Sequence, residues 1–299
     1  MTVPGIAMVA AVLLAVGYAV LGALILLPAT SRASRPLLPI LNTETVIAAA
    51  AIVPFLLPAA VRLPLLLALA ARILWEAASV AVLRRRDRQG LATLIASAAI
   101  AAIVAGTFQF ALDGAAKLLA IAALVAVLAL CLLASRRIGD GSALARLASE
   151  TALFPAVPLG LTVAAAMDEA RIVPLLGVLI LVETFDSYAL LGGKLFGRHR
   201  IFPRLSPNKT AEGLFFGAAM LLFTALALAR ITGAATMPEA AVVAMLAAIA
   251  TVAGDLLASR LKRASGVKDY PAVMRHQGGT LDIADAAIMA GAVVALLPL

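Results

Sequence analysis

Residues 259–287 read SRLKRASGVKDYPAVMRHQGGTLDIADAA and separate two apolar runs, each long enough to form a helix. They crowd charges, glycines and a proline into one place, although the chain is 64% hydrophobic and only 13% charged. An ordinary soluble domain carries charge on about a quarter of its residues. The flanking runs therefore predict membrane helices, and the polar stretch predicts a site where two of them end.

Apolar runs of similar length recur along the whole chain. A helix needs about 20 apolar residues to cross a hydrocarbon core about 30 Å thick, and lipid forces the backbone to satisfy its own hydrogen bonds. We therefore predict an all-α, polytopic membrane protein with about nine or ten transmembrane helices and no soluble domain. The predicted helices lie near residues 5–27, 44–60, 64–83, 90–112, 115–134, 150–167, 171–192, 211–230, 238–262 and 281–298.

The 24 Lys and Arg residues, which contribute to a net charge of +8, are distributed very unevenly about these helices. Alternating the connections between the two membrane sides places nineteen on one side and four on the other, with Arg72 inside a helix. The positive-inside rule makes the richer side cytoplasmic, so the loop within residues 259–281 faces the cytoplasm. Topology thus explains the charge, and we expect no nucleic-acid partner. The expected location is the cell membrane, taken as a bacterial inner membrane.

Three helix ends in the second half bring carboxylates to this cytoplasmic side. Asp186 lies near the end of the seventh run, Asp255 near the end of the ninth, and Asp282 and Asp285 at the start of the tenth. Mg²⁺ takes one or two carboxylates together with phosphate oxygens, and basic side chains stabilise phosphoryl transfer. The pattern predicts a magnesium-dependent phosphate site. The alternative is that these aspartates cap helix ends or neutralise neighbouring Lys and Arg.

Two residue pairs are interpreted as structural. Arg72 and Glu76 are four residues apart in the third run, which suits an ion pair on one helix face. A functional role is the alternative, because ionisable residues inside membranes are often functional. Gly213 and Gly217 form a GxxxG pair, which we interpret as a helix-packing motif.

The polar stretch resembles the signature of the phosphatidate cytidylyltransferase family, also called CDP-diacylglycerol synthases. That signature runs Ser, two residues, Lys-Arg, four residues, Lys-Asp, then a spacer to His-Gly-Gly and Asp-Arg-x-Asp. Nine positions match it in register: Ser259, Lys262, Arg263, Lys268, Asp269, Gly278, Gly279, Asp282 and Asp285. The block DSYALLGGKLFGRHRIFPRLSPNKTAEGLFFG at 186–217 is similar to the family's second conserved region. The resemblance covers about residues 150–299.

The match departs from the signature at two positions. Gln277 stands where the family has histidine, with His276 one residue earlier, and Ile283 stands where it has arginine. An amide cannot act as an acid or a base, and a lost arginine removes one phosphate-binding fork, for which Arg275 is close enough to substitute. The carboxylates of the signature are intact. The departures therefore weaken the case for phosphatidate as the substrate more than the case for CTP chemistry.

The resemblance implies a membrane-embedded nucleotidyltransferase. It would transfer CMP from CTP to a lipid phosphate, phosphatidate, giving CDP-diacylglycerol and pyrophosphate in phospholipid biosynthesis. The implied regions are N-terminal transmembrane helices over residues 1–148, about five in number, and a catalytic transmembrane region over residues 149–299. The implied partners are CTP, the lipid phosphate and membrane lipids, and a homodimer is an option.

The implied cofactor is Mg²⁺ held by Asp255 and Asp282, and a second, monovalent or divalent, cation is an option. The implied catalytic residues are Asp255, Asp282, Asp285, Lys268 and Asp269. The implied substrate-binding residues are Ser259, Lys262, Arg263, Lys209, Ser206, Asp186, Gly278 and Gly279.

Two alternative functions stay open. One is a CTP-dependent lipid kinase, or a cytidylyltransferase for another lipid phosphate. The other is a small-solute transporter, which would place its site near the bilayer midplane and often between repeats. The ionisable residues here gather at one face and in one half of the chain, which disfavours transport.

We predict that a cysteine at position 272 reacts with a membrane-impermeant maleimide only after cell lysis. The variant is Ala272→Cys in a background where the single cysteine, Cys131, is replaced by alanine. The charge asymmetry places this loop in the cytoplasm, which the reagent cannot reach in intact cells. Labelling is compared with that of the cysteine-free parent. Ready labelling in intact cells would show that the loop lies on the outer side of the membrane, where cytosolic CTP cannot reach it.

Overall fold

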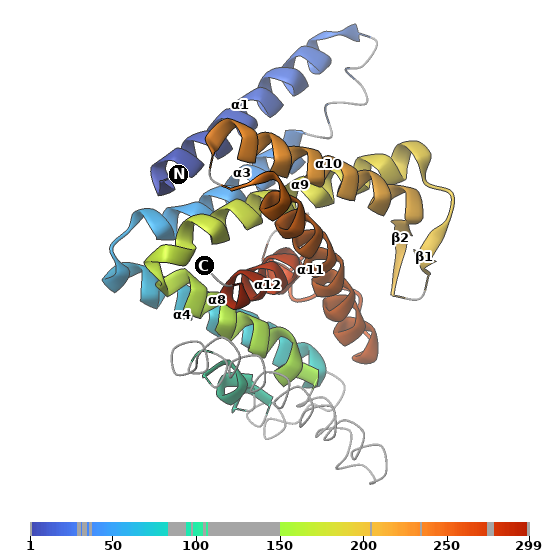
Figure 1. Cartoon of the computed structure of the whole chain (residues 1–299). Helices are drawn as coiled ribbons and strands as arrows, with labels where there is room; N and C mark the ends of the chain where they lie inside the picture. The colour runs from blue at the N-terminus through green and yellow to red at the C-terminus, as the bar shows by residue number, and fades with distance from the viewer. Residues whose placement is uncertain are drawn as a thin grey trace. The chain divides into compact units, whose positions relative to one another are not determined.

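The computed structural model describes residues 2–28, 31, 35, 38–82, 94–96, 98–103, 106, 150–203, 205–233, 235–273 and 278–297. Within these ranges the regular secondary structure is helical apart from one small hairpin, which confirms the predicted all-α fold (Figure 1). The predicted helix near 115–134 lies outside the described residues, and the one near 90–112 lies partly outside them.

Five described helices are long and apolar enough to cross a membrane, which supports the prediction of a polytopic membrane protein. They are Val3–Leu26, Ala59–Ala81, Glu169–Phe196, Ala211–Thr232 and Met237–Ala264. Shorter apolar helices lie at Leu41–Leu56, Leu94–Ile103 and Ala152–Met167.

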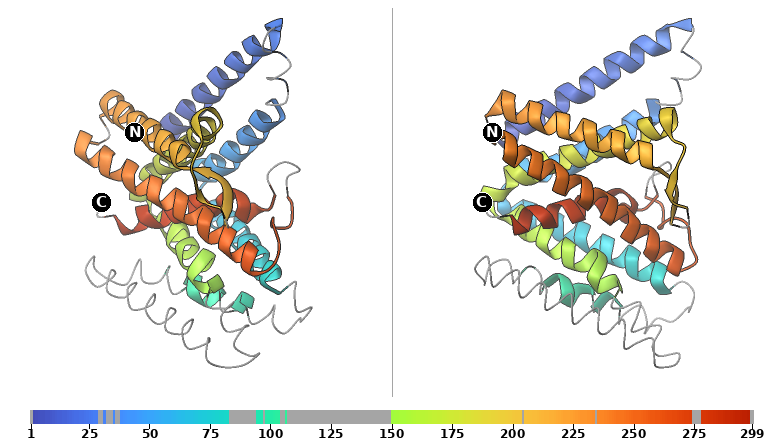
Figure 2. Two further views of the ribbon diagram at one scale, coloured as in Figure 1. Left: turned by 90° about the vertical axis from the view of Figure 1, so that its right-hand side faces the viewer. Right: turned by 45° about the vertical axis from the view of Figure 1, so that its right-hand side comes forward.

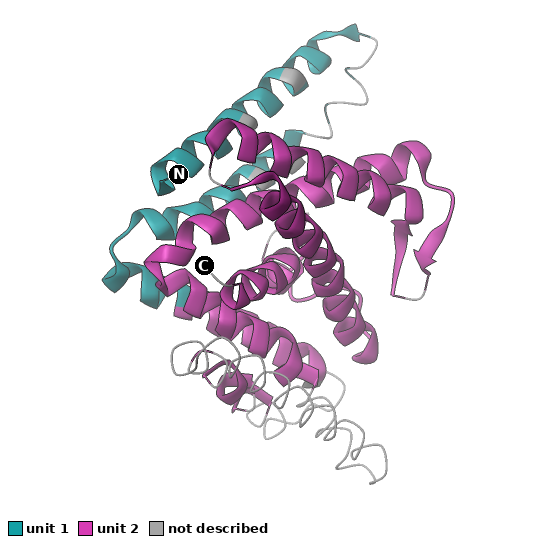
Figure 3. Cartoon of the chain, viewed as in Figure 1, with its two compact units in different colours: residues 1–66 teal, residues 67–299 magenta. Residues whose placement is uncertain are grey.

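The chain divides into two compact units, residues 1–66 and residues 67–299 (Figure 3). The first unit holds α1 (Val3–Leu26), α3 (Leu38–Ile52), the 3-10 turn η2 (Val53–Leu56) and the start of α4 (Ala59–Val82). Within it, the Tyr18 hydroxyl donates to Asn42 Oδ1 at 2.8 Å and lies 2.9 Å from Thr45 Oγ1. These polar contacts join α1 to α3.

The second unit holds the remainder of α4 and the elements that carry the polar motifs. They are the π-helical turn η4 (Ala152–Ala156), α8 (Val157–Met167), α9 (Glu169–Phe196), β1 (Arg200–Phe202), β2 (Ser206–Thr210), α10 (Ala211–Thr232), α11 (Met237–Ala264) and α12 (Thr280–Leu296). Helix α12 packs against α8, α9 and α11. Its buried residues Leu281 and Ile288 belong to a core that also includes Ile73 of α4 and Leu161 of α8.

Side-chain caps explain where the long helices of this unit begin. Asp168 accepts the N–H of Ala170 at 3.0 Å before α9, and Thr210 accepts the N–H of Gly213 at 3.2 Å before α10. Thr236 and Glu239 form a reciprocal capping box before α11. Each cap satisfies N–H groups that have no partner within their own helix.

The segment between α9 and α10, which the sequence suggests is a loop, forms an antiparallel hairpin. Arg200 pairs with Thr210 and Phe202 with Ser206. The hairpin lets the backbone pair with itself where the chain reverses between two packed helices. In the right panel of Figure 2, the hairpin and the C-terminal end of α11 lie on the same side, away from the C terminus. Lys209 on β2 is thereby carried toward the end of α11.

The GxxxG pair packs α10 against α9, as the sequence predicts. A Cβ atom at Gly213 would lie 2.7 Å from the carbonyl oxygen of Ala189, and one at Gly217 would lie 2.9 Å from that of Phe185. The two backbones therefore approach too closely for any larger residue.

We predict that Gly217→Ala lowers the free energy of unfolding in detergent by about 1–3 kcal/mol, because the added methyl overpacks this contact. The control is Gly177→Ala in α9, where a Cβ would meet nothing within 4 Å. That change should be neutral or stabilising by up to about 1 kcal/mol. Equal effects at the two glycines would contradict the packing role.

Candidate active site

Four elements of the second unit bring charged side chains together. Asp285 of α12 is buried, with 6% exposed, and the charges of Asp255 on α11, Asp186 on α9 and Lys262 on α11 all act on its carboxylate. Asp285 also accepts the N–H of Ala286 at 2.6 Å. We call Asp186, Lys209, Asp255, Lys262, Asp282 and Asp285 the charged cluster.

A glycine allows α11 and α12 to meet beside this cluster. A Cβ atom at Gly254 would lie 2.3 Å from the carbonyl oxygen of Asp285, so a side chain there would collide with the backbone of α12. The next residue, Asp255, thus lies beside the first turns of α12. This approach explains how carboxylates 30 positions apart in the sequence become neighbours.

Asp282 is the most constrained member of the cluster. Lys262 Nζ donates to its Oδ1 at 2.5 Å, and the N–H groups of Tyr270 and Gly279 donate to its Oδ2 at 3.0 and 2.9 Å. The carboxylate therefore caps its own helix, neutralises a lysine and holds the loop before α12. The alternative of capping and charge neutralisation, raised by the sequence, describes these contacts correctly.

Lys209 links the hairpin to α11. Its Nζ atom lies 2.9 Å from Asp255 Oδ2, and the two side chains are 18% and 28% exposed. The pair is close enough for an ion pair, but its angles are not those of a hydrogen bond, and Asp255 Oδ2 is buried without one. Asp255 is thus neutralised by Lys209 and still has an oxygen able to accept another partner.

Tyr270 closes the cluster on the loop side. Its ring is almost fully buried, its hydroxyl donates to the carbonyl of Ala258 at 3.3 Å, and Lys262 Nζ lies 5.3 Å from the ring centroid. Burial first, then the charges of Asp282, Asp285 and Glu76, raises the pKa of Tyr270 far above its usual range. The phenol is therefore a neutral hydrogen-bond donor at every physiological pH.

The charge balance of the cluster suits a divalent cation. Its six members carry four formal negative charges and two positive ones, and like charges at low dielectric repel strongly. Among the described residues, no three His, Cys, Asp or Glu side chains form a metal-binding group by themselves. Mg²⁺ is usually held by one or two carboxylates together with substrate phosphates. Asp255 and Asp285 offer such carboxylates, so the donor set fits Mg²⁺.

The other predicted site residues fall into two groups. Ser259 is buried in α11, and Ser206 is half-buried on β2. Arg263, Lys268 and Asp269 are exposed at the end of α11 and in the loop after it, and Arg263 donates to the carbonyl of Val267 at 3.1 Å. Met274, Arg275, His276 and Gln277, which include the first departure from the family signature, lie outside the described residues. The second departure, Ile283, is half-buried in the first turn of α12.

The predicted glycines have structural roles at these positions. Gly278 has a φ of +80°, a region that favours glycine. A Cβ atom at Gly279 would lie 2.6 Å from Tyr270 Cβ and 2.7 Å from Glu76 Oε2. The space beside Gly279 is therefore filled by protein atoms.

Glu76, like Tyr270, is a contributor that the sequence-based assignment left out of the site. The predicted ion pair with Arg72 is confirmed, with Arg72 Nε donating to Glu76 Oε1 at 2.8 Å. The same carboxylate, however, also reaches the backbone of α12. Its only signal in the sequence is an acidic residue within an apolar run.

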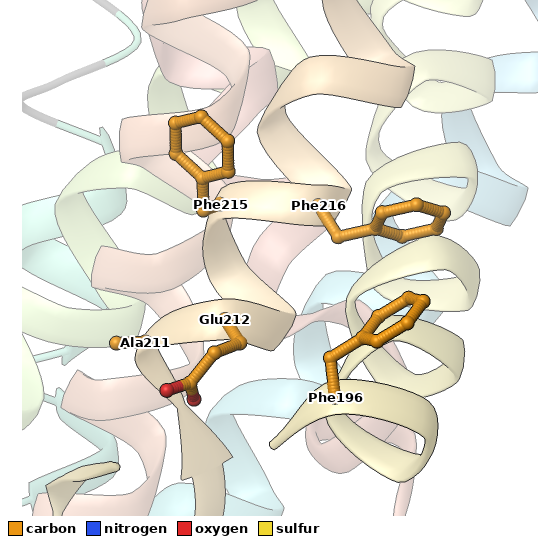
Figure 4. Close-up of a pocket in the computed structure, with 5 residues that line it drawn as sticks. All are labelled: Phe196, Ala211, Glu212, Phe215 and Phe216. Carbon is orange, nitrogen blue, oxygen red and sulfur yellow. The ribbon is translucent and has the colours of Figure 1, made fainter. Parts of the chain in front are cut away.

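A separate shallow pocket lies at the junction of α9 and α10. It is lined by Phe196, Ala211, Glu212, Phe215 and Phe216 (Figure 4). None of these residues belongs to the charged cluster, and we assign the pocket no part in the chemistry.

Comparison with known proteins decides the family. The profile described as "Cytidylyltransferase family" matches residues 40–298. The chain belongs to the cytidylyltransferase family. The match begins well before residue 150 and takes in most of α3 and all of α4 as well as the charged cluster.

Curated relatives of this cytidylyltransferase family member cover a shorter segment. An uncharacterized protein, YnbB, of Escherichia coli is 33% identical over 111 residues, which is 37% of this chain and 37% of that protein. The phosphatidate cytidylyltransferase of Haemophilus influenzae is 37% identical over 120 residues, 37% of this chain and 40% of that protein. That of Helicobacter pylori strain J99 is 37% identical over 115 residues, 38% of this chain and 42% of that protein. The match thus spans about two fifths of each relative's length.

We predict that Lys209 and Asp255 are energetically coupled. In a double-mutant cycle of Lys209→Met and Asp255→Asn, the unfolding free energies in detergent should be non-additive by about 1 kcal/mol. The control cycle uses Arg260→Met and Glu150→Gln, whose ion pair at 3.0 Å has an arginine that is 58% exposed. Exposed pairs contribute little, so its coupling should be smaller. If the effects of Lys209→Met and Asp255→Asn on the unfolding free energy are additive, this ion pair does not stabilise the contact between the hairpin and α11.

Proposed function

We propose that the protein transfers CMP from CTP to a lipid phosphate at the cytoplasmic face of the membrane, with phosphatidate as substrate and CDP-diacylglycerol and pyrophosphate as products. The observation that carries the proposal is the charged cluster. Carboxylates from α11 and α12 pair with lysines from β2 and α11 beside the loop that bears the family signature. Family membership and the names of the curated relatives support the same reaction.

The reaction needs charge stabilisation more than proton transfer. A lipid phosphate oxygen forms a bond to the α-phosphorus of CTP, and the bond from that phosphorus to the bridging oxygen of the β-phosphate breaks, releasing pyrophosphate. A phosphate monoester is already an anion near pH 7. No side chain has to deprotonate it, so glutamine at position 277 is compatible with the reaction.

The lysines would hold the phosphates. Lys209 and Lys262 now neutralise Asp255 and Asp282, and each can exchange its carboxylate for a phosphate oxygen when substrate enters. The exposed side chains of Arg263 and Lys268 would attract the triphosphate from the cytoplasm. Ser259, Ser206 and Asp186 would contribute polar contacts.

Asp255, Asp282 and Asp285 are the residues that would hold Mg²⁺. When bound, the ion would neutralise the charge that develops on the phosphates during transfer. The carboxylates would place it beside Lys209 and Lys262. Packing of α11 on α12 keeps these groups together before substrate arrives.

The direct test uses the purified full chain in nanodiscs with Mg²⁺, CTP labelled in its α-phosphate, and dioleoyl phosphatidate. Label appearing in CDP-diacylglycerol, with release of pyrophosphate, is the expected result. Release of CDP with phosphorylation of a lipid alcohol would instead identify a CTP-dependent lipid kinase. Product formed with another lipid phosphate but not with phosphatidate would show that the other lipid is the substrate. Absence of any CTP turnover across such a panel would defeat the proposal.

We predict that Asp282→Asn lowers kcat by about 100-fold or more at saturating Mg²⁺, the size typical for loss of a group that stabilises transition-state charge. The control is Glu239→Gln in the first turn of α11. It also replaces a helix-capping carboxylate by an amide, but it lies outside the charged cluster, so its kcat should stay within about twofold. Near-normal turnover by Asp282→Asn would show that Asp282 has no role in metal binding or catalysis.

A further inference from the structure

Helix α12 begins inside the protein. Gly279 and Leu281 are buried, so the N–H groups of the first turn need protein partners. Asp282 Oδ2 accepts the N–H of Gly279 at 2.9 Å. The N–H groups of Thr280 and Leu281 donate to Oε1 and Oε2 of Glu76, at 3.0 and 2.8 Å.

Glu76 reaches this turn from α4, about 200 positions earlier in the chain. Its side chain is fully buried, and its charge is balanced by Arg72, which is 39% exposed. The Arg72 guanidinium also lies over the Trp75 ring, 4.6 Å from the centroid. A negative charge at a helix N-terminus is favourable because the helix dipole is positive there. Glu76 thus caps a helix to which it does not belong.

The same contacts connect Glu76 to the charged cluster. Gly279 leaves room for both Tyr270 and the Glu76 carboxylate, and the N–H of Tyr270 binds Asp282 Oδ2. Moving the first turn of α12 would therefore shift Asp282, and with it the hydrogen bond from Lys262. Asp285 lies one turn further along the same helix.

We propose that Glu76 is a positioning residue for cytidylyl transfer: by holding the N–H groups of Thr280 and Leu281, it sets where α12 places Asp282 and Asp285. This role rests on the proposed function and deepens it. It also gives a helix of the first half of the chain a part in the reaction. Glu76 does not touch substrate and acts only through α12.

The opposite end of α12 offers a matched control. Arg171 of α9 donates through its Nη1 to the carbonyls of Val294 and Leu297 at 2.7 and 2.9 Å, and it pairs with Asp168. Like Glu76, it is a charged side chain from another helix that makes two hydrogen bonds to one terminus of α12. Arg171→Met releases the C-terminal end of α12, which is distant from the charged cluster. Glu76→Gln releases the N-terminal end, which carries Asp282 and Asp285.

The experiment combines hydrogen–deuterium exchange with kinetics on the full chain in nanodiscs. In Glu76→Gln, we expect faster amide exchange in residues 279–285 and a fall in kcat of about 10- to 100-fold, the scale expected for a displacement of about 1 Å. The Mg²⁺ concentration for half-maximal rate should rise, and KM for dioleoyl phosphatidate should stay within about twofold. Arg171→Met should speed exchange only near residues 293–297, lower the thermal midpoint and leave kcat and the Mg²⁺ requirement within about twofold.

Two results would overturn the positioning role. One is unchanged exchange in residues 279–285 of Glu76→Gln, which needs no activity to observe. The other is an equal loss of kcat in Glu76→Gln and Arg171→Met, which would show that both act through stability alone. If Glu76→Gln does not fold, Glu76→Asp keeps the charge with a shorter reach and should show the same changes at smaller size. Absence of turnover in the wild-type chain would instead defeat the proposed function, and the exchange data would still report on the capping.

Discussion

Burying a helix start imposes a requirement that shapes the whole second unit. The first N–H groups of α12 have no backbone partner within their helix, and they belong to residues that are buried or half-buried, so protein acceptors are needed. Two carboxylates meet them, Asp282 from the helix itself and Glu76 from α4. Because each carboxylate is itself held by a basic side chain, Lys262 or Arg72, satisfying the backbone also organises the charges around it.

The charged cluster follows from this arrangement. Once α12 is fixed, Gly254 lets α11 lie against it, and Asp255 comes beside Asp285. The hairpin then supplies Lys209 from the other side. Low-dielectric surroundings make every one of these charges expensive to leave unpaired. The two lysines offset only part of the negative charge of the cluster. A divalent cation and a basic phosphate-binding loop would neutralise the remainder.

Several residues that the family motif would assign to substrate binding also have structural roles. Gly279 makes room for Tyr270 and Glu76, and Asp282 caps α12 and anchors the loop through Tyr270. The two kinds of role are compatible, because the groups of a binding site must be held rigidly before the ligand arrives. Charged residues outside this framework, such as Lys268 and Asp269, remain exposed to solvent, where incoming phosphates would meet them first.

The sequence by itself determined the fold class, because hydrophobic runs of membrane length can only be helices in lipid. It also predicted the GxxxG packing and the Arg72–Glu76 pair, and it named all six members of the charged cluster as candidate site residues, because charged residues stand out sharply in an apolar chain. It did not predict the hairpin, whose pairing depends on where α9 and α10 meet, or the capping of α12 by Glu76. That contact joins residues about 200 positions apart, and no local pattern specifies which acceptor a buried N–H will find. Only the packing of α4 against the start of α12 decided it, since hydrogen bonds require partners within about 3 Å.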